Sequence, residues 1–351
     1  MKGPYSMKGK TMKRICLLLA AAVLAGCRAK APAPVTSAAK TSAAKTSAAE
    51  TQAAETSAAE ASAAEISAAQ IGAAEAVQPP SKPAPLVTET KGAAAAAPKD
   101  VDYFADYTAD IRADVSAAVS SSSSLQQELA AVRAVNEKYT ELSHGAQTQH
   151  EINRSSEWFY TIWDAELNDL WNRIRSTADA GVMERLLKEQ RNWVAMKEEI
   201  TLEAIGHRED GGSMYPMLWN VFQAEITERR AYILAAELAM IRGEAFMMPE
   251  KSNKYGIFAD NQGTGSVYSS LITEQFWGDA DRAEISIFRT GHLSGLFTEQ
   301  EDGSLAFVSS DEKVRGIIRI DPWKSAVFEV TDCVEPAIVH AGEVFEFDFV
   351  F

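Results

Sequence analysis

The feature that most limits how this chain can fold is a low-complexity stretch over residues 28–99. Between residues 36 and 75 a five-residue unit, Thr-Ser-Ala-Ala followed by Lys or Glu, repeats with variations. Five residues advance a helix by about 500°, so equivalent positions form no stripe, and the unit holds nothing that could fill a core. Five prolines and a run of alanines follow at residues 79–98. We therefore predict a disordered tether with at most transient helix, and only the residues after it can pack.

The segment before the tether has the pattern of a bacterial lipoprotein signal peptide. Lys13 and Arg14 precede a short apolar run that ends in Leu-Ala-Gly-Cys27. The run is too short for a permanent membrane helix, which needs about 20 residues. Its ending resembles the lipobox, whose cysteine receives the lipid, palmitate included. We expect residues 1–26 to be removed, Cys27 to be lipidated, and residues 27–100 to form the tether. Arg28, rather than Asp, after the cysteine favours the outer membrane, facing the periplasm.

The charge of the chain limits which partners it can bind, and its cysteine content limits whether a disulfide can stabilise the fold. The formal net charge is −15; residues 146–250 carry −7 and residues 251–351 carry −9, while residues 1–145 carry +1. An acidic surface disfavours nucleic acid and attracts cationic partners within a Debye length of about 8 Å. Of the three cysteines, Cys16 lies in the signal peptide and Cys27 is expected to be lipidated. Cys333 is then alone, so no intramolecular disulfide is expected.

Helical periodicity occupies residues 101–250. Residues 102–142 show two thin amphipathic patterns on either side of the serine run 120–124. Residues 148–242 contain three apolar faces with helical spacing, separated at Gly181 and at the pair Gly211 and Gly212. These patterns predict an antiparallel unit of three helices, with two further helices before it.

The pattern changes to short β-strands over residues 251–351. Six segments rich in β-branched and aromatic residues are separated by turn residues: 266–273, 284–289, 304–308, 314–320, 326–330 and 344–351. In the last segment four phenylalanines alternate with other residues, which predicts one buried and one wet face. We predict a small antiparallel sandwich or barrel, and an α+β chain with the helical domain first.

Motifs spread over residues 148–240 match a known family in order and spacing. The segment holds a Thr-Gln-x-Glu-x-Asn opening, an Asp-x-Glu-Leu-Asn motif, a Gln-Arg-x-Trp motif and a Gly-Gly turn before Ile-Thr-x-x-Arg. In this combination it resembles the amino-terminal domain of the LprI-type lysozyme inhibitor family. The resemblance implies structural or partner-binding roles for Asp164, Asn168, Gln190, Arg191, Trp193, Lys197, Gly211, Gly212 and Arg230.

The chain departs from the family at two positions that commonly carry cysteine. Ser155 and Thr201 stand there, so the resemblance implies that a bridge has been lost from both ends together. Loss of a disulfide costs about 2–4 kcal/mol unless packing compensates.

The polar groups of these motifs leave structural, ligand-binding and catalytic roles open. Asp164, Glu166 and Asp169 lie near each other on one helix, and paired carboxylates could perform acid–base chemistry. A buried clamp between helices, with Asp164 and Asn168 facing a neighbouring helix, explains the same spacing.

The polar run 207–210 is expected to be a solvated loop. Trp277 and Trp323 are either interface anchors or core residues. We find no catalytic, metal-binding or cofactor motif, and expect no enzyme and no cofactor.

Three functions remain open. The first is a binding module that inhibits lysozyme-type cell-wall hydrolases, with lysozyme or another cationic envelope protein as its partner. The second is a structural or assembly lipoprotein that docks onto another envelope protein through an apolar patch. The third is a hydrolase with an unrecognised site in the β domain, which would show clustered carboxylates with perturbed pKa values.

Overall fold

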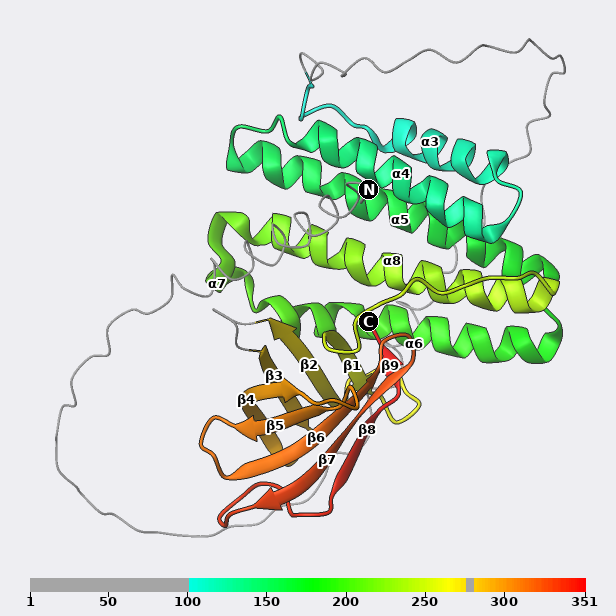
Figure 1. Cartoon of the computed structure of the whole chain (residues 1–351). Helices are drawn as coiled ribbons and strands as arrows, with labels where there is room; N and C mark the ends of the chain where they lie inside the picture. The colour runs from blue at the N-terminus through cyan, green and yellow to red at the C-terminus, as the bar shows by residue number, and fades with distance from the viewer. Residues whose placement is uncertain (1–100, 276–280) are drawn as a thin grey trace, which may run out of the picture. The chain divides into compact units, whose positions relative to one another are not determined.

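The computed structural model describes residues 101–275 and 281–351, and helices precede strands throughout (Figure 1). The predicted signal peptide, Cys27 and the tether lie outside the described residues, as does Trp277. Over the two described ranges, none of the helices combines the length and the apolar character that crossing a membrane requires.

Five long helices make up the first part. They are α3 (Thr108–Ser121), α4 (Leu125–Ser143), α5 (Gln149–Thr177), α6 (Ala180–Ile205) and α8 (Tyr215–Arg242). A short helix α7 (Arg208–Gly211) and a 3₁₀ turn η1 (Gly212–Met214) join α6 to α8. In Figure 1 α8 runs between α5 and α6, while α3 and α4 lie on the other side of α5. The predicted three-helix unit and the two helices before it are confirmed.

Side-chain caps fix where these helices begin. The Thr148 hydroxyl accepts a hydrogen bond from the Glu151 N–H (3.2 Å), and the Glu151 carboxylate accepts one from the Thr148 N–H (2.8 Å). This capping box satisfies two backbone donors at the start of α5, and it is made by the opening motif of the family resemblance. Asp179 caps α6 in the same way, accepting from the Val182 N–H at 2.9 Å.

Tryptophans fill the helical core. Trp158, Trp163 and Trp171 line the buried face of α5, and Trp193 lies on the buried face of α6. The pairing of α5 with α8 is the most extensive helix contact. Burial of such large apolar side chains dominates the stability of a helical unit.

Nine antiparallel strands form the second part. They are β1 (Gly256–Asp260), β2 (Ser269–Gln275), β3 (Asp281–Ile287), β4 (Gly291–Glu299), β5 (Leu305–Ser309), β6 (Val314–Asp321), β7 (Ser325–Cys333), β8 (Val344–Phe347) and β9 (Phe349–Val350). Each of the first seven pairs with the next, and β9 pairs with β1. Because β8 and β9 are separated only by Asp348, one short segment joins both edges into a nearly closed barrel (Figure 1). The predicted fold class is confirmed.

Two strands were not predicted from the sequence, and both contain glycine. In β4 the inward positions are Leu293, Gly295 and Phe297. A Cβ on Gly295 would clash with the Val308 carbonyl oxygen, so the close approach of β5 requires a glycine where the pattern needs an apolar side chain. The other strand, β1, is short and has Gly, Ala and Asp at three of its five positions, all weak strand formers.

The last segment differs from the simple alternation that the sequence predicts. Phe347 and Val350 are both in the barrel core, although three positions separate them, so the strand breaks at Asp348. Phe351 is instead in the core of the helices, and Phe349 packs against that core. Glu346 and Asp348 are exposed and Phe351 is buried, as predicted, but the buried phenylalanines do not share one core: beyond Asp348 they pack on the helices, while Val350 enters the barrel.

Two aromatic contacts join strands to helices. The Phe351 ring stacks on Trp193 with 6.4 Å between ring centres, and the Arg229 guanidinium donates a hydrogen bond to the backbone oxygen of Phe351. Trp323 lies 5.8 Å from the Tyr232 ring, and its indole N–H donates to a backbone carbonyl at 3.1 Å. The sequence left Trp323 as either an interface anchor or a core residue. In the structure its ring packs within the chain, against Tyr232 of α8.

Candidate functional site

Four of the motif residues come together between α5 and α6. The Asn168 side-chain amide donates to the backbone oxygen of Asp164 (2.8 Å) and to its carboxylate (3.1 Å). The Tyr160 hydroxyl donates to the same carboxylate at 3.3 Å. From α6, the Lys197 ammonium lies 4.8 Å from the ring centres of both Tyr160 and Trp193. The arrangement is a polar clamp that links the two helices.

Partial burial sets the charges of this clamp. Burial lowers the pKa of Lys197 to about 8, an effect that the Asp164 carboxylate opposes. Burial also raises the pKa of Asp164, against the opposite effects of Lys197 and the Tyr160 hydroxyl. Each charge therefore compensates part of the desolvation of the other. The groups are occupied with one another, which suits a structural role.

A second motif pair lies in the core between α6 and α8. The Arg230 Nε donates to the Gln190 side-chain oxygen at 2.8 Å, and Arg230 is only 5% exposed. Burial lowers the pKa of Arg230 to about 10, so the guanidinium stays charged at neutral pH. Glu189 lies 4.0 Å from the guanidinium and supplies a counter-charge. The Gln-Arg-x-Trp and Thr-x-x-Arg motifs thus meet through these side chains.

The remaining motif residues lie at the surface or in the turn after α6. Arg191 is exposed on α6. Gly212 has a φ of +52°, which favours glycine, and a Cβ on Gly211 would lie 2.9 Å from the Tyr215 ring. The polar residues 207–210 are exposed as expected, although residues 208–211 form α7 rather than a loop.

Hydrogen bonds occupy the positions where the family commonly carries cysteine. Thr201 is fully buried; its hydroxyl donates to the Lys197 backbone oxygen and accepts from the Gln223 amide, each at 2.6 Å. Ser155 is also buried, and its hydroxyl donates to a backbone oxygen one turn earlier in α5. Both hydroxyls are satisfied within the helical core.

A buried carboxyl pair lies between α4 and α5. Glu166 is 0% exposed and Glu128 4% exposed, and Arg173 pairs with both Glu128 and Asp169. Burial, followed by the hydrogen bond and repulsion between the two glutamates, raises the pKa of Glu166 to about 9. Two ionised carboxylates offer only acceptors, so a proton on Glu166 supplies the missing donor. Sequence reasoning missed Glu128 and Arg173; the spacing of Asp169 and Arg173, four apart on one helix, was the available signal.

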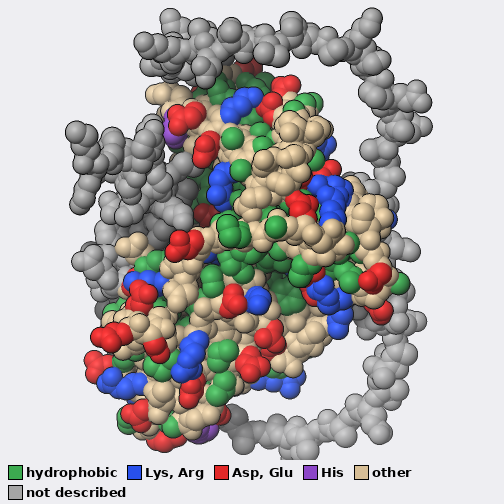
Figure 2. All heavy atoms as spheres, turned by 45° about the vertical axis from the view of Figure 1, so that its right-hand side comes forward, with side chains coloured by type: hydrophobic (Ala, Val, Ile, Leu, Met, Phe, Trp, Pro, Cys, Tyr) green, Lys and Arg blue, Asp and Glu red, His purple; other side chains and the backbone are tan. Residues whose placement is uncertain are grey.

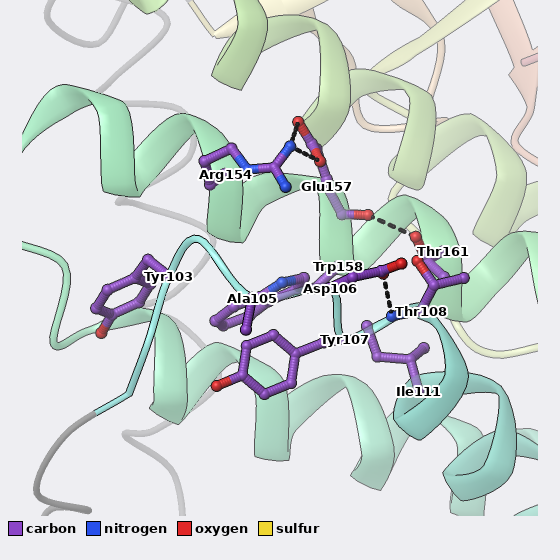
Figure 3. Close-up of a pocket in the computed structure, with 10 residues that line it drawn as sticks. All are labelled: Tyr103, Ala105, Asp106, Tyr107, Thr108, Ile111, Arg154, Glu157, Trp158 and Thr161. Atoms are coloured by element: carbon purple, nitrogen blue, oxygen red, sulfur yellow. Dashed lines mark hydrogen bonds and ion pairs between the residues drawn. The ribbon is translucent and has the colours of Figure 1, made fainter.

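Two surface hollows flank the start of α3. The first is a small notch walled by the segment before α3 and by α5, with Trp158 at its base (Figure 3). Asp106 accepts from the Thr108 N–H at 2.9 Å, and Arg154 pairs with Glu157 at 3.0 Å. The charged side chains that line this notch therefore already have partners within the protein.

The second hollow, which we call the α3–α4 hollow, has a volume of about 330 Å³. It is lined by Tyr107, Asp110, Ala113, Asp114, Lys138, Tyr139 and Leu142. Tyr107 lines both hollows. Sequence reasoning used the tyrosines only as apolar positions. The signal it missed is four aspartates at a spacing of four, at residues 102, 106, 110 and 114.

The barrel carries exposed apolar side chains near one end. Phe288, Val334 and Ile338, here called the barrel rim patch, are 45%, 58% and 40% exposed. They belong to the turn after β3 and to the loop between β7 and β8, and Ile338 packs against Gly291 of the same end. Within residues 101–275 and 281–351, no three or more His, Cys, Asp and Glu side chains are placed to hold a metal ion.

Comparison with known proteins gives one result. Residues 140–234 match the family model described as Lysozyme inhibitor LprI. The matched segment runs from the last turn of α4 through α5 and α6 into α8, and so contains the motif residues. No curated protein and no solved structure matches the chain.

Proposed function

From the match of residues 140–234 to the LprI model, we propose that this chain is a binding module that inhibits lysozyme-type cell-wall hydrolases. The match is the observation that carries the proposal, because it covers the helices in which the motif residues lie. The matched family is one of inhibitors, so the proposal requires recognition and no catalytic chemistry. The perturbed carboxyl group of Asp164 supports the same view, since the Tyr160 hydroxyl and the Asn168 amide already engage it.

Net charge supports a basic partner. Lysozyme is strongly basic, and residues 146–351 carry a net charge of −16, from −7 and −9 in their two parts. On the face shown in Figure 2, Asp and Glu side chains are spread among Lys and Arg side chains rather than gathered in one patch. Attraction by net charge increases the rate of encounter, while the contacts that hold the complex are local.

The proposed location is the cell envelope. The lipobox ending at Cys27 would anchor the chain, and the Ala-rich residues 28–99 would carry the helices away from the lipid surface. Anchoring in the outer membrane, facing the periplasm, would place the binding module near peptidoglycan.

The proposal is tested by lysozyme inhibition. The purified protein is titrated into a cell-wall lysis assay at low and at physiological salt. We expect inhibition near stoichiometry, with weaker binding at higher salt because screening reduces the attraction between opposite net charges. A protein of similar size and net charge but unrelated fold is the control. No inhibition at a large excess contradicts the proposal.

The barrel rim patch favours a second candidate, an assembly lipoprotein that docks onto another envelope protein. Exposed apolar side chains in one place often mark an interaction surface. Under this function, Ile338→Asp should abolish recovery of the partner from envelope extracts by the purified protein. Thr298→Asp, at an exposed position of β4, is the matched control. Equal recovery with both variants excludes the patch.

A further inference from the structure

We propose that the α3–α4 hollow receives an arginine side chain of the basic partner. The inference rests on the proposed function and names the contact that would hold the partner. Most residues that line the hollow lie outside residues 140–234, so the family match does not assign this site.

The space exists because a small residue stands on the exposed face of α3. Ala113 contributes only a methyl group to the lining, which also includes Tyr107 just before α3 and Tyr139 near the end of α4. A volume of about 330 Å³ exceeds that of one side chain. Entry of a long side chain therefore needs no rearrangement of α3 or α4.

One carboxylate in the lining is available to a ligand. Asp114 is engaged, because Lys138 pairs with it at 2.6 Å and the Tyr139 hydroxyl donates to it at 3.0 Å. Asp110 is exposed, and no hydrogen bond or ion pair reaches it from the parts of the chain that the structure describes. A guanidinium can donate two parallel hydrogen bonds to one carboxylate, which an ammonium cannot do.

Two aromatic rings provide walls that are already held in place. Tyr107 packs edge-on against Trp158 with 5.0 Å between ring centres, and Tyr139 packs against the same tryptophan at 5.8 Å. Lys138 lies 5.1 Å from the Tyr139 ring centre, so that ring already has a cation. The Tyr107 ring and Asp110 remain for a planar guanidinium, and fixed rings reduce the entropy lost on binding.

The first experiment measures lysozyme binding and inhibition by four variants of the purified protein. Asp110→Asn removes the available charge, and Ala113→Leu fills the hollow. Glu184→Gln removes an exposed charge elsewhere in the helical part, and Ala117→Leu enlarges another exposed alanine of α3. We expect Asp110→Asn and Ala113→Leu to weaken binding about tenfold or more, as for loss of a charged hydrogen bond. The two controls should bind like the unmodified protein.

Chemical modification of lysozyme identifies the cation. Lysozyme with its arginines blocked should bind the unmodified protein and Asp110→Asn equally weakly, whereas acetylation of its lysines should preserve the difference between them. Wild-type affinity in both Asp110→Asn and Ala113→Leu overturns the inference while the proposed function stands.

A tetra-arginine peptide separates the two proposals. We expect it to bind the unmodified protein more tightly than tetra-lysine does, and Asp110→Asn to remove that preference. Lack of lysozyme binding together with this peptide result contradicts the proposed function alone. No preference for tetra-arginine in the unmodified protein contradicts the inference.

Discussion

Buried polar side chains in the helical part form pairs in which each group replaces the water lost by the other. Arg230 and Gln190 are one such pair, and Arg173 with Glu128 is another. A buried charge without a partner is costly, so these pairs matter most when one member is removed. The motif pattern singled out Gln190 and Arg230, but it could not say that they meet, because contacts between helices depend on packing rather than spacing.

Removal of Gln190 should leave the Arg230 guanidinium short of a partner. We expect Gln190→Ala to lower the free energy of unfolding by about 1.5–3 kcal/mol, the cost of losing a hydrogen bond to a buried charged group. The neighbouring variant Arg191→Ala changes an exposed side chain and should stay within about 0.5 kcal/mol. Chemical denaturation of both variants measures the difference. Equal stability of the two would contradict a supporting role for the Gln190–Arg230 pair.

Glu166 should make stability depend on pH. Its folded-state pKa of about 9 lies above its ordinary value, so its contribution is fully present below about pH 4.5 and is lost as pH rises through 9. Within that window the loss has a limiting slope of about 1.4 kcal/mol per pH unit. Glutamine resembles the protonated side chain, so Glu166→Gln should gain stability relative to the unmodified protein as pH increases.

The control for this pH dependence is Glu184→Gln, which changes an exposed glutamate on α6. Denaturation at several pH values between 5 and 9 would compare both variants with the unmodified protein. Parallel curves for Glu166→Gln and the unmodified protein would show that Glu166 is ionised throughout, contrary to the buried carboxyl pair.

At the scale of elements, periodicity identified the helices well because each helix has a broad apolar face and a clear cap or turn at its ends. Strands were harder. The β4 pattern is interrupted by Gly295, whose inward position is set by the Val308 carbonyl of the next strand. The break at Asp348 depends on pairing with β1 and β7, which are distant in the sequence. The α3–α4 hollow was missed because it depends on how two helices pack.

Gly295 should tolerate no larger side chain. In Gly295→Val the new Cβ would meet the Val308 carbonyl and the Phe307 ring, so β4 and β5 must separate. We expect a loss of about 1–3 kcal/mol or more, as for other overpacked positions. Thr298→Val, at an exposed position of the same strand, should have little effect. Thermal unfolding compares them, and a fully stable Gly295→Val protein would argue against the β4–β5 register.

At the scale of the whole molecule, the fold class follows from the change of periodicity near Pro249. Barrel closure was only one of two predicted options, since a sandwich has the same strand pattern. The partner is the hardest property to predict, because the motif residues are mostly buried and surface recognition leaves little trace in a single sequence.

The proposed membrane anchor is tested by Cys27→Ser. Loss of the lipid acceptor should move the protein from the membrane fraction to the soluble fraction, because an acyl chain contributes about 0.8 kcal/mol per buried CH₂ group. Fractionation followed by detection of the protein measures this. Cys333→Ser should leave the distribution unchanged. Persistent membrane association of Cys27→Ser would exclude the lipobox interpretation.

The segment 344–351 also determines when the barrel can be completed during synthesis. β1 can pair with β2 as soon as both have emerged, but it acquires its other neighbour only when residues 349–350 arrive. Until then both edge strands expose unpaired backbone groups, a state prone to pairing with other chains. The helices, including the α5–α8 pair, all precede β1 in the sequence and can pack earlier. A ribosome-stalled chain lacking this segment should therefore contain folded helices and an open, aggregation-prone sheet.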